Sequence, residues 1–138
     1  MPSSTVKLIS SDGDQFLVPR SVITLSATIN NLVVDLGDSE PILLKDLTSE
    51  TLKKVIIWCQ HELEHPQHRE QRYEPTDWEK EFFKVSHDML IALVAAGDEQ
   101  GIESLLDAGC KVLANLMKGK TPEEFYAFMD ANANEAHN

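Results

Sequence analysis

Two short stretches of the chain carry residue types at spacings that could do chemistry. The first contains His61, Glu62 and His65, which match the H-E-x-x-H pattern of zinc hydrolases, where two histidines bind the metal and the glutamate acts as a base. His68 is a conceivable third ligand. Pro66 follows immediately, however, so the helix that would hold both histidines ends inside the proposed site. We therefore expect an exposed polar helix end here, and a zinc hydrolase is only a remote alternative.

The second stretch is Gly119-Lys120-Thr121, which matches the end of a phosphate-binding loop. That loop needs the pattern G-x-x-x-x-G-K-[ST] after a strand, whereas Ala114 occupies the first glycine position and the preceding residues have helical spacing. Gly119 is instead expected to end one helix, and Thr121-Pro122 to begin the next. Because no other catalytic signature is present, we expect no catalytic residue, no metal and no cofactor.

The composition is that of a single globular domain with an acidic surface. The 138 residues are 42% apolar and 25% charged, and 23 acidic against 12 basic side chains give a net charge of −11. This charge repels phosphates and no Lys/Arg stripe opposes it, so we expect no nucleic-acid partner. The longest apolar run, residues 89–96, is too short to span a bilayer, so we expect no membrane partner. Cys59 and Cys110 have no framework spacing, which predicts reduced thiols in the cytoplasm and nucleus.

The first third of the chain predicts a small sheet. Alternating apolar residues on either side of Asp12-Gly13 indicate a hairpin, because this dipeptide favours a two-residue turn. Residues 20–36 mix β-branched side chains with helical spacing, and we expect two short helices there. Residues 42–44 predict a third short strand.

The remainder predicts helices. Thr48 or Ser49 can cap a helix whose apolar stripe comprises Leu52, Val55, Ile56, Cys59 and Leu63. Residues 65–75 hold almost nothing to bury and are expected to form a flexible loop. Thr76 with Glu79 forms a capping box, and Ser86 can cap a further, more apolar helix.

The clearest amphipathic pattern runs from Ile102 to Leu116, and Gly119 is placed to end it. Thr121-Pro122-Glu123-Glu124 forms a second capping box that opens a short helix with Phe125. The tail, residues 131–138, has no apolar stripe and is expected to be disordered. The expected class is therefore α/β (α+β).

Three segments resemble one family of partner-binding proteins. Residues 6–13 resemble the first strand and turn of elongin C and of the Skp-one family, the S-phase kinase-associated adaptors of SCF ubiquitin ligases. Residues 52–61 and 101–111 are similar to the Skp-one family rather than to elongin C. Residues 114–125, Ala-Asn-Leu-Met-Lys-Gly-Lys-Thr-Pro-Glu-Glu-Phe, are nearly a fingerprint of that family. The resemblance is collinear from about Val6 to Phe125.

The resemblance implies a BTB/POZ fold over residues 1–100, a small sheet packed with helices. Residues 101–130 would then form the dimerisation and F-box-binding helices of the Skp-one type, in a C-terminally shortened version. It implies a non-catalytic adaptor that links an F-box protein to a cullin. By resemblance, the F-box-binding residues are Ile102, Leu105, Leu113, Leu116, Met117, Lys118, Gly119, Lys120, Thr121, Pro122 and Phe125.

One departure concerns the turn where the family meets the cullin. The family usually has Asn-Tyr there, whereas this chain has Asp98-Glu99, so these two residues are the candidate cullin contacts. Because aromatic anchors tend to dominate interface energy, a carboxylate in that place should weaken cullin binding. An alternative is therefore a truncated paralogue that binds one partner only, as a competitor or regulator. Unfilled apolar groove surface would also favour weak self-association.

Overall fold

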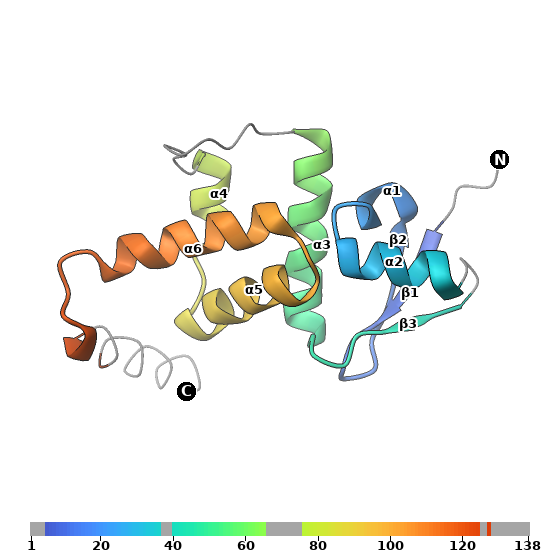
Figure 1. The fold of residues 1–138 in the computed structure, drawn as a ribbon, viewed down its shortest axis with the longest axis horizontal. Helices are drawn as coiled ribbons and strands as arrows, with labels where there is room; N and C mark the ends of the chain where they lie inside the picture. The colour runs from blue at the N-terminus through green and yellow to red at the C-terminus, as the bar shows by residue number, and fades with distance from the viewer. Residues whose placement is uncertain (1–4, 37–39, 66–75, 125–126, 128–138) are drawn as a thin grey trace.

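The computed structural model describes residues 5–36, 40–65, 76–124 and 127 of the chain (Figure 1). These residues form a three-stranded sheet and the helices α1 to α6, which confirms the expected α/β class. The predictions for Phe125, for the loop beyond His65 and for the tail concern residues outside these ranges. None of the helices in the described part is both long and apolar enough to cross a membrane.

The sheet begins with the predicted hairpin. Strands β1 (Thr5–Ile9) and β2 (Gln15–Pro19) pair antiparallel, with Leu8 opposite Phe16. Gly13 has a φ of +92° in the turn, a conformation that glycine adopts without strain. Strand β3 (Ile42–Leu43) pairs parallel with β1 on its other side, so the strand order is β2-β1-β3.

Two helices connect the hairpin to β3, as the sequence predicts. Helix α1 (Arg20–Ile23) follows β2 directly, and α2 (Ala27–Leu36) begins after Ser26. The Ser26 hydroxyl accepts a hydrogen bond from the Ile29 amide at 3.1 Å, which satisfies a free donor in the first turn of α2. Ile29 and Val33 of α2 are buried.

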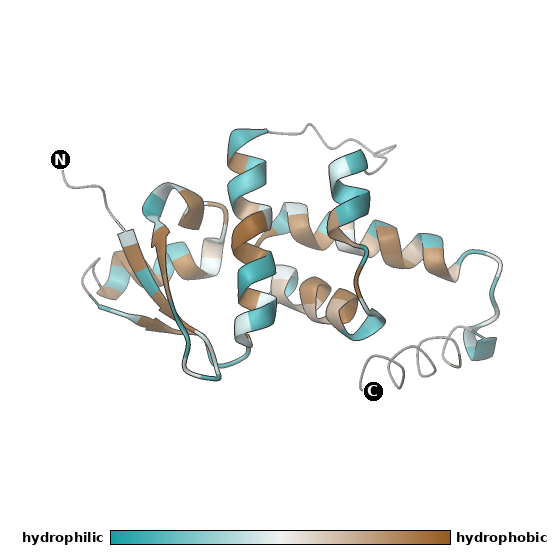
Figure 2. Cartoon of the chain, turned by 180° about the vertical axis from the view of Figure 1, so that it is seen from behind, coloured by the Kyte–Doolittle hydropathy of each residue, from teal (hydrophilic) through white to brown (hydrophobic). Residues whose placement is uncertain are grey.

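Helix α3 (Ser49–Glu64) stands in the middle of the molecule, between the sheet with α1 and α2 on one side and α4 to α6 on the other (Figure 1). Thr48 is its N-cap, and its hydroxyl accepts from the Thr51 amide at 3.4 Å. Figure 2 shows α3 banded with hydrophobic and hydrophilic residues. The predicted stripe is wrong at one end: Leu63 is 41% exposed, whereas Trp58, left out of the stripe, is fully buried.

The last three helices form the other side of the molecule. Helix α4 (Asp77–Phe82) opens with the predicted Thr76 capping box. Helix α5 (His87–Glu99) is capped by Ser86, also as predicted. Helix α6 (Glu103–Met117) returns along α5, and the two pack closely at Gly97, where a Cβ atom would lie 2.7 Å from the Leu106 amide nitrogen. The domain boundary near residue 100 falls between these two packed helices and stays a prediction.

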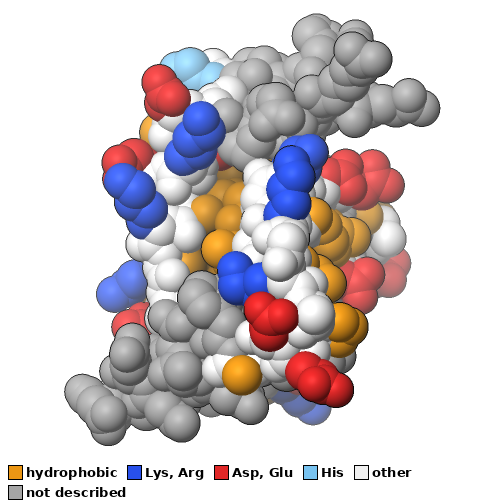
Figure 3. Space-filling view, turned by 90° about the vertical axis from the view of Figure 1, so that its left-hand side faces the viewer, with side chains coloured by type: hydrophobic (Ala, Val, Ile, Leu, Met, Phe, Trp, Pro, Cys, Tyr) orange, Lys and Arg blue, Asp and Glu red, His pale blue; other side chains and the backbone are white. Residues whose placement is uncertain are grey.

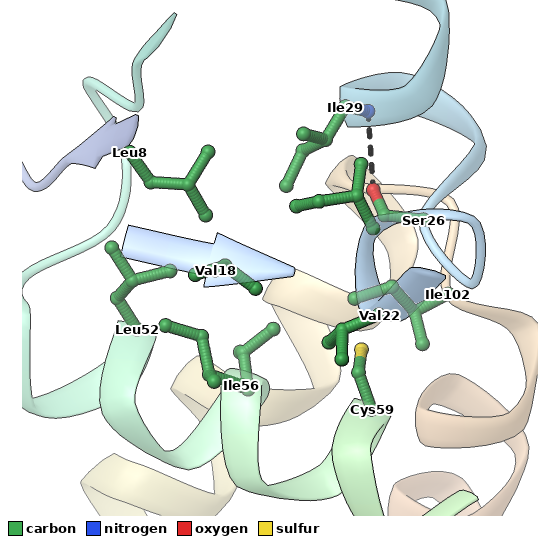
Figure 4. Close-up of a pocket in the computed structure, with 11 residues that line it drawn as sticks. Leu8, Val18, Val22, Ser26, Ile29, Leu52, Ile56, Cys59 and Ile102 are labelled. Atoms are coloured by element: carbon green, nitrogen blue, oxygen red, sulfur yellow. Dashed lines mark hydrogen bonds between the residues drawn. The ribbon is translucent and has the colours of Figure 1, made fainter. Parts of the chain in front are cut away.

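The core runs through the molecule on both sides of α3, from the sheet, α1 and α2 to α4, α5 and the first half of α6. One part of it lies where the sheet, α1, α2 and α3 meet. A small apolar cavity remains there, lined by side chains from β1, β2, α1, α2 and α3 together with Ile102 (Figure 4). Its one polar lining residue, Ser26, is already hydrogen bonded. An apolar cavity of this kind has no group that would bind a polar ligand.

Candidate partner-binding surfaces

The first half of α6 belongs to the core. Ile102 is 1% exposed and lines the core cavity, and Leu105 is fully buried. Side chains at these positions hold α6 against the rest of the molecule and offer nothing to a partner. Both predicted F-box contacts are therefore corrected, and they are left out of the surface described next.

The second half of α6 extends past the helices that cover the first half (Figure 1). At Gly109, α6 meets α4 and α5 closely, since a Cβ atom there would lie 2.7 Å from Val94 Cγ2 and 3.8 Å from Phe83 Cε1. Leu113 and Leu116 lie one and two turns further along the same face and are only half-buried. Met117 is 48% exposed. The apolar face of α6 thus extends beyond the part on which α4 and α5 pack.

Figure 3 shows this end of the molecule, where hydrophobic side chains gather in a hollow. Lys and Arg side chains stand on both sides of the hollow, and Asp and Glu side chains lie beside some of them and towards the edges of this face. Soluble proteins rarely leave large contiguous apolar surface exposed without a use for it. We call the end formed by Leu113, Leu116, Met117 and the residues up to Pro122 the α6 surface.

The end of α6 is closed in the way the sequence predicts. Gly119 has a φ of +79°, and the Lys120 amide donates to the Met117 carbonyl at 2.9 Å. The Lys120 ammonium donates to the Leu116 carbonyl at 3.0 Å. Thr121 then caps residues 122–124, which are helical, by accepting from the Glu124 amide at 3.1 Å. Lys118, Gly119, Thr121 and Pro122 are exposed, whereas Phe125 lies outside the described residues.

Helix α4 is held to α3 by an aromatic cluster. Trp58 lies with ring centroids 5.2 Å from Phe82 and 5.7 Å from Phe83, and its indole N–H donates to the Ser104 hydroxyl at 3.0 Å. The Lys54 ammonium donates to the Phe82 carbonyl at 2.9 Å and lies 4.2 Å from the Phe82 ring centroid. The hydrogen bond from Trp58 to Ser104 ties this cluster to α6. Because Trp58 packs on α4 and is fully buried, the buried face of α3 includes Trp58 and leaves Leu63 exposed.

The histidines that suggested zinc chemistry take part in this packing. The His61 ring stacks on Trp78 with centroids 3.5 Å apart and planes 1° apart, and it also stacks with His65 at a centroid distance of 4.7 Å. The pKa of His61 is lowered by burial and then by His65, despite the nearby carboxylates Glu62, Glu79 and Glu64. Glu62 is itself buried. Within the described ranges no three His, Cys, Asp or Glu side chains are grouped to hold a metal ion.

Asp98 and Glu99, expected in a turn, are the last two residues of α5 and are exposed to solvent next to the turn that leads into α6, at the opposite end of α6 from the α6 surface. The backbone of this α5–α6 turn is fixed by the start of α2. The amides of Ala27 and Thr28 donate to the carbonyls of Gly101 and Gln100, each at 3.2 Å. The Thr28 hydroxyl donates to the Glu99 carbonyl at 3.1 Å. The two acidic side chains therefore stand on a rigid support.

Comparison with known proteins places most of the chain in one family. The tetramerisation domain of the Skp1 family matches residues 4–64, and the dimerisation domain of the Skp1 family matches residues 103–126. The Skp1-related protein of Caenorhabditis elegans is 44% identical over 133 residues, covering 86% of this chain and 76% of that protein. The chain belongs to the Skp1 family. Its POZ part contains the sheet, α1, α2 and α3, which confirms the expected BTB/POZ fold.

Two further relatives of the Skp1 family carry informative names. The E3 ubiquitin ligase complex SCF subunit sconC of Talaromyces marneffei is 40% identical over 130 residues, covering 88% of this chain and 81% of that protein. The suppressor of kinetochore protein 1 of Schizosaccharomyces pombe is 35% identical over 137 residues, with coverage of 88% and 81%. The match to the dimerisation domain includes the whole α6 surface.

Sequence reasoning missed the residues that support the two surfaces. Ser26 and Thr28 hold the turn that carries Asp98 and Glu99, yet they lie more than 70 positions away in the chain. Trp58 organises the α3–α4 packing through partners about 20 to 46 positions away. No local pattern contains such contacts, although a tryptophan inside an amphipathic helix is a signal that it anchors a neighbour.

Proposed function

We propose that the chain is a non-catalytic adaptor subunit of an SCF-type E3 ubiquitin ligase. It binds an F-box protein at the α6 surface and a cullin at the side that carries Asp98 and Glu99. The adaptor fixes the distance and orientation between a captured substrate and the ubiquitin-loading machinery. Its two thiols, Cys59 and Cys110, are free, which fits a place in the cytoplasm and nucleus.

The observation that carries the proposal is the apolar face at the end of α6, which no other described helix covers. Leu113 and Leu116 are half-buried and Met117 is 48% exposed, at the point where α6 has passed the helices that pack on it. An apolar helix face of this kind suits a partner helix laid against it. The segment also lies within the match to the Skp1 dimerisation domain.

The residues with catalytic potential support a non-catalytic role. The His61 ring stacks with Trp78 and with His65. Burial, with the charge of Glu62, raises the pKa of Cys59 to about 12, so this thiol is a core side chain rather than a nucleophile. Lys120 and Thr121, the remnant of the phosphate-loop pattern, close one helix and begin the next.

A second candidate is an adaptor that binds the F-box protein alone and competes with adaptors that bind both partners. The observation that favours it is the exposed Asp98-Glu99 pair, because a cullin site built around an aromatic anchor loses contact there and must pair or desolvate two charges. Both candidates share the α6 surface.

The test is reconstitution of the complete chain with an F-box domain and with the N-terminal domain of a cullin, followed by size-exclusion chromatography. Met117→Glu should weaken F-box binding by about ten- to a hundredfold, the usual effect of losing an interface anchor. Leu17→Glu is the matched control, because Leu17 is 70% exposed on β2. A single complex that contains the chain, the F-box domain and the cullin domain supports the ligase adaptor. An F-box complex that excludes the cullin supports the competitor, and failure to bind any F-box domain overturns both.

A further inference from the structure

Strand β2 lies at the edge of the sheet. The strand order is β2-β1-β3, so the outer side of β2 has no strand partner within the described part of the chain. The Ser10 amide donates to the Asp14 carbonyl at 2.9 Å, which shows that the Asp14 carbonyl faces β1. Main-chain groups alternate between the two sides of a strand. Those of Gln15, Leu17 and Pro19 therefore face the outer edge.

Two residues of β2 have the properties of an edge position. Pro19 lies opposite Thr5 and has no N–H group, but no hydrogen bond to β1 is lost because its main chain faces outward. Leu17 lies opposite Lys7 and is 70% exposed, more than any other large apolar side chain of the described residues. Unpaired main-chain groups beside an exposed apolar side chain are a template for a further strand.

The sequence of this edge is complementary to itself in the antiparallel direction. If two copies meet about a twofold axis at Leu17, each residue lies opposite the one that is equally far on the other side of Leu17. Asp14 of one copy then lies opposite Arg20 of the second copy, and Gln15 lies opposite Pro19. Both copies supply the same residues, so the opposite charges meet twice. An axis at any other residue of β2 separates Asp14 from Arg20.

We propose that two copies of the chain associate through β2 and form one continuous sheet with a twofold axis at Leu17. The Leu17 residues of the two copies exchange main-chain hydrogen bonds, and their side chains become neighbours. The Gln15 N–H of each copy donates to the Pro19 carbonyl of the other, so the pairing requires no N–H from proline. The sheet and the α6 surface lie at opposite ends of the molecule, so both copies keep the α6 surface accessible (Figure 1).

The charges at this edge allow the association. Asp14 is exposed. Arg20 also interacts within its own chain, but a guanidinium has five N–H donors and can bind a second acceptor. The two Lys7 strands are three strand spacings apart in the joined sheet, about 14 Å, which exceeds the screening length of about 8 Å at physiological ionic strength. Repulsion between two chains of charge −11 is screened in the same way.

One strand from each copy gives a small interface, so we expect a weak dimer with a dissociation constant of about 10–100 µM. Sedimentation velocity of the full chain over a range of concentrations in physiological salt measures it. Asp14→Lys alone and Arg20→Glu alone each place like charges opposite one another and should weaken the dimer at least tenfold. An equimolar mixture of the two variants restores opposite charges at both contacts and should recover the association to within about threefold of the unaltered chain.

The matched controls are Asp46→Lys and Lys45→Glu, which make the same charge changes at exposed positions outside β2 and should leave the dimer unchanged. Met117→Glu should also leave it unchanged, since it alters the α6 surface instead. Amide exchange of Gln15 and Leu17 should slow as the concentration of the unaltered chain rises. Recovery in the mixture requires that both variants are folded, and circular dichroism verifies it.

Three results overturn the inference. The first is an unaltered chain that stays monomeric at several hundred micromolar, well above the expected dissociation constant. The second is a dimer that is lost in Met117→Glu but persists in Asp14→Lys, because the association then lies at the α6 surface. The third is a mixture of Asp14→Lys and Arg20→Glu that does not associate although both are folded. None of these results bears on F-box or cullin binding, so the proposed function is tested separately.

Discussion

The Ser26 hydroxyl donates a hydrogen bond to the main-chain carbonyl of Gln100, 74 positions further along the chain. The same hydroxyl accepts from the Ile29 amide at 3.1 Å, so one buried side chain both caps α2 and holds the turn between α5 and α6 (Figure 4). The two candidate partner surfaces lie at opposite ends of α6, and this bond fixes the end that carries Asp98 and Glu99. The position of that turn therefore depends on α2, in the other half of the molecule.

Removing this hydroxyl should loosen the turn. Ser26→Ala leaves the Ile29 amide without its side-chain acceptor and the Gln100 carbonyl without one donor, and we expect a loss of about 1–3 kcal/mol in the free energy of unfolding. Thr28→Val removes only the exposed hydrogen bond to the Glu99 carbonyl, so it should lower the free energy of unfolding by only a few tenths of the loss expected for Ser26→Ala. Urea denaturation measures both. Amide hydrogen exchange at Gly101 and Ile102 should accelerate in Ser26→Ala, and unchanged exchange there would contradict the assigned link.

The sequence predicts local structure wherever a few adjacent residues decide it. Asp12-Gly13 fixes the hairpin turn, Thr76 with Glu79 fixes the start of α4, and Gly119 fixes the end of α6. Prediction from the sequence fails where contacts with an element far along the chain determine which face of a helix is buried. Leu63 fits the helical period of α3, yet the aromatic cluster of α4 selects the neighbouring face with Trp58 and leaves Leu63 exposed.

The site residues divide in the same way. The fingerprint from Ala114 to Phe125 lies within the match to the dimerisation domain, and the role of these residues in partner binding stays a prediction. The resemblance does not separate surface from core, since Ile102 and Leu105 are buried. Amphipathic spacing gives the apolar face of a helix but not how far along its length the neighbours reach.

The contact between α5 and α6 should be sensitive to a single methyl group. A Cβ atom at Gly97 would lie 2.7 Å from the Leu106 nitrogen and 3.0 Å from the Leu106 Cα. Both are backbone atoms, so relieving the contact requires a shift of helix α6 rather than a change of side-chain rotamer. We expect Gly97→Ala to destabilise the fold by about 1–3 kcal/mol through overpacking, measured by urea denaturation. Gly109→Ala is the matched control: it also replaces a helical glycine, but its Cβ would meet the end of the Val94 side chain. If both substitutions have equal cost, close packing at Gly97 is not the cause.

The two cysteines should react at very different rates. The Cys59 thiol is buried and its pKa is raised to about 12, so at pH 8 only about one thiolate in ten thousand is present, whereas Cys110 is exposed. An aromatic disulfide reagent should modify one thiol rapidly in the native chain and the second only in denaturant. Cys110→Ala should abolish the rapid phase, and Cys59→Ala should leave it unchanged. Two rapid phases in the native chain would contradict the burial of Cys59.

The His61 stack should make stability depend on pH. The pKa of His61 in the folded chain is lowered from about 6.5 by burial and by His65, so the unfolded chain binds the proton more readily. The contribution of His61 is therefore complete above pH 6.5 and is lost as the pH falls through the folded pKa below it. Thermal unfolding at pH 7.5 and pH 5.5 measures the loss.

A variant that stacks without titrating isolates this effect. His61→Phe retains a ring on Trp78, and we expect its midpoint temperature to fall less on acidification than that of the unaltered chain. His65→Gln should reduce the pH dependence in part, since one cause of the lowered pKa is removed. If the unaltered chain and His61→Phe lose the same stability between the two pH values, His61 does not contribute and the acidic side chains account for all of the change.

The acidic pair at the α5–α6 turn should limit cullin binding. Asp98 and Glu99 are exposed on a backbone held by α2, so replacing them changes the surface without moving the turn. Asp98→Asn with Glu99→Tyr restores the pair that the family usually has there, and it removes two charges that a cullin would have to pair or desolvate. We expect cullin binding to strengthen by about 1–3 kcal/mol, the scale of one interface anchor, in a titration against the N-terminal domain of a cullin.

The matched control for this change is Asp35→Asn with Glu40→Tyr, which alters charge and adds an aromatic ring equally at two exposed positions on either side of residues 37–39. It should leave the cullin affinity unchanged, and F-box binding at the α6 surface should be unaffected in both double variants. If the Asp98/Glu99 variant binds the cullin no better than the control, the turn is not the cullin contact. A decrease would instead mean that the acidic pair faces a basic partner surface, because removing two carboxylates would then remove attraction.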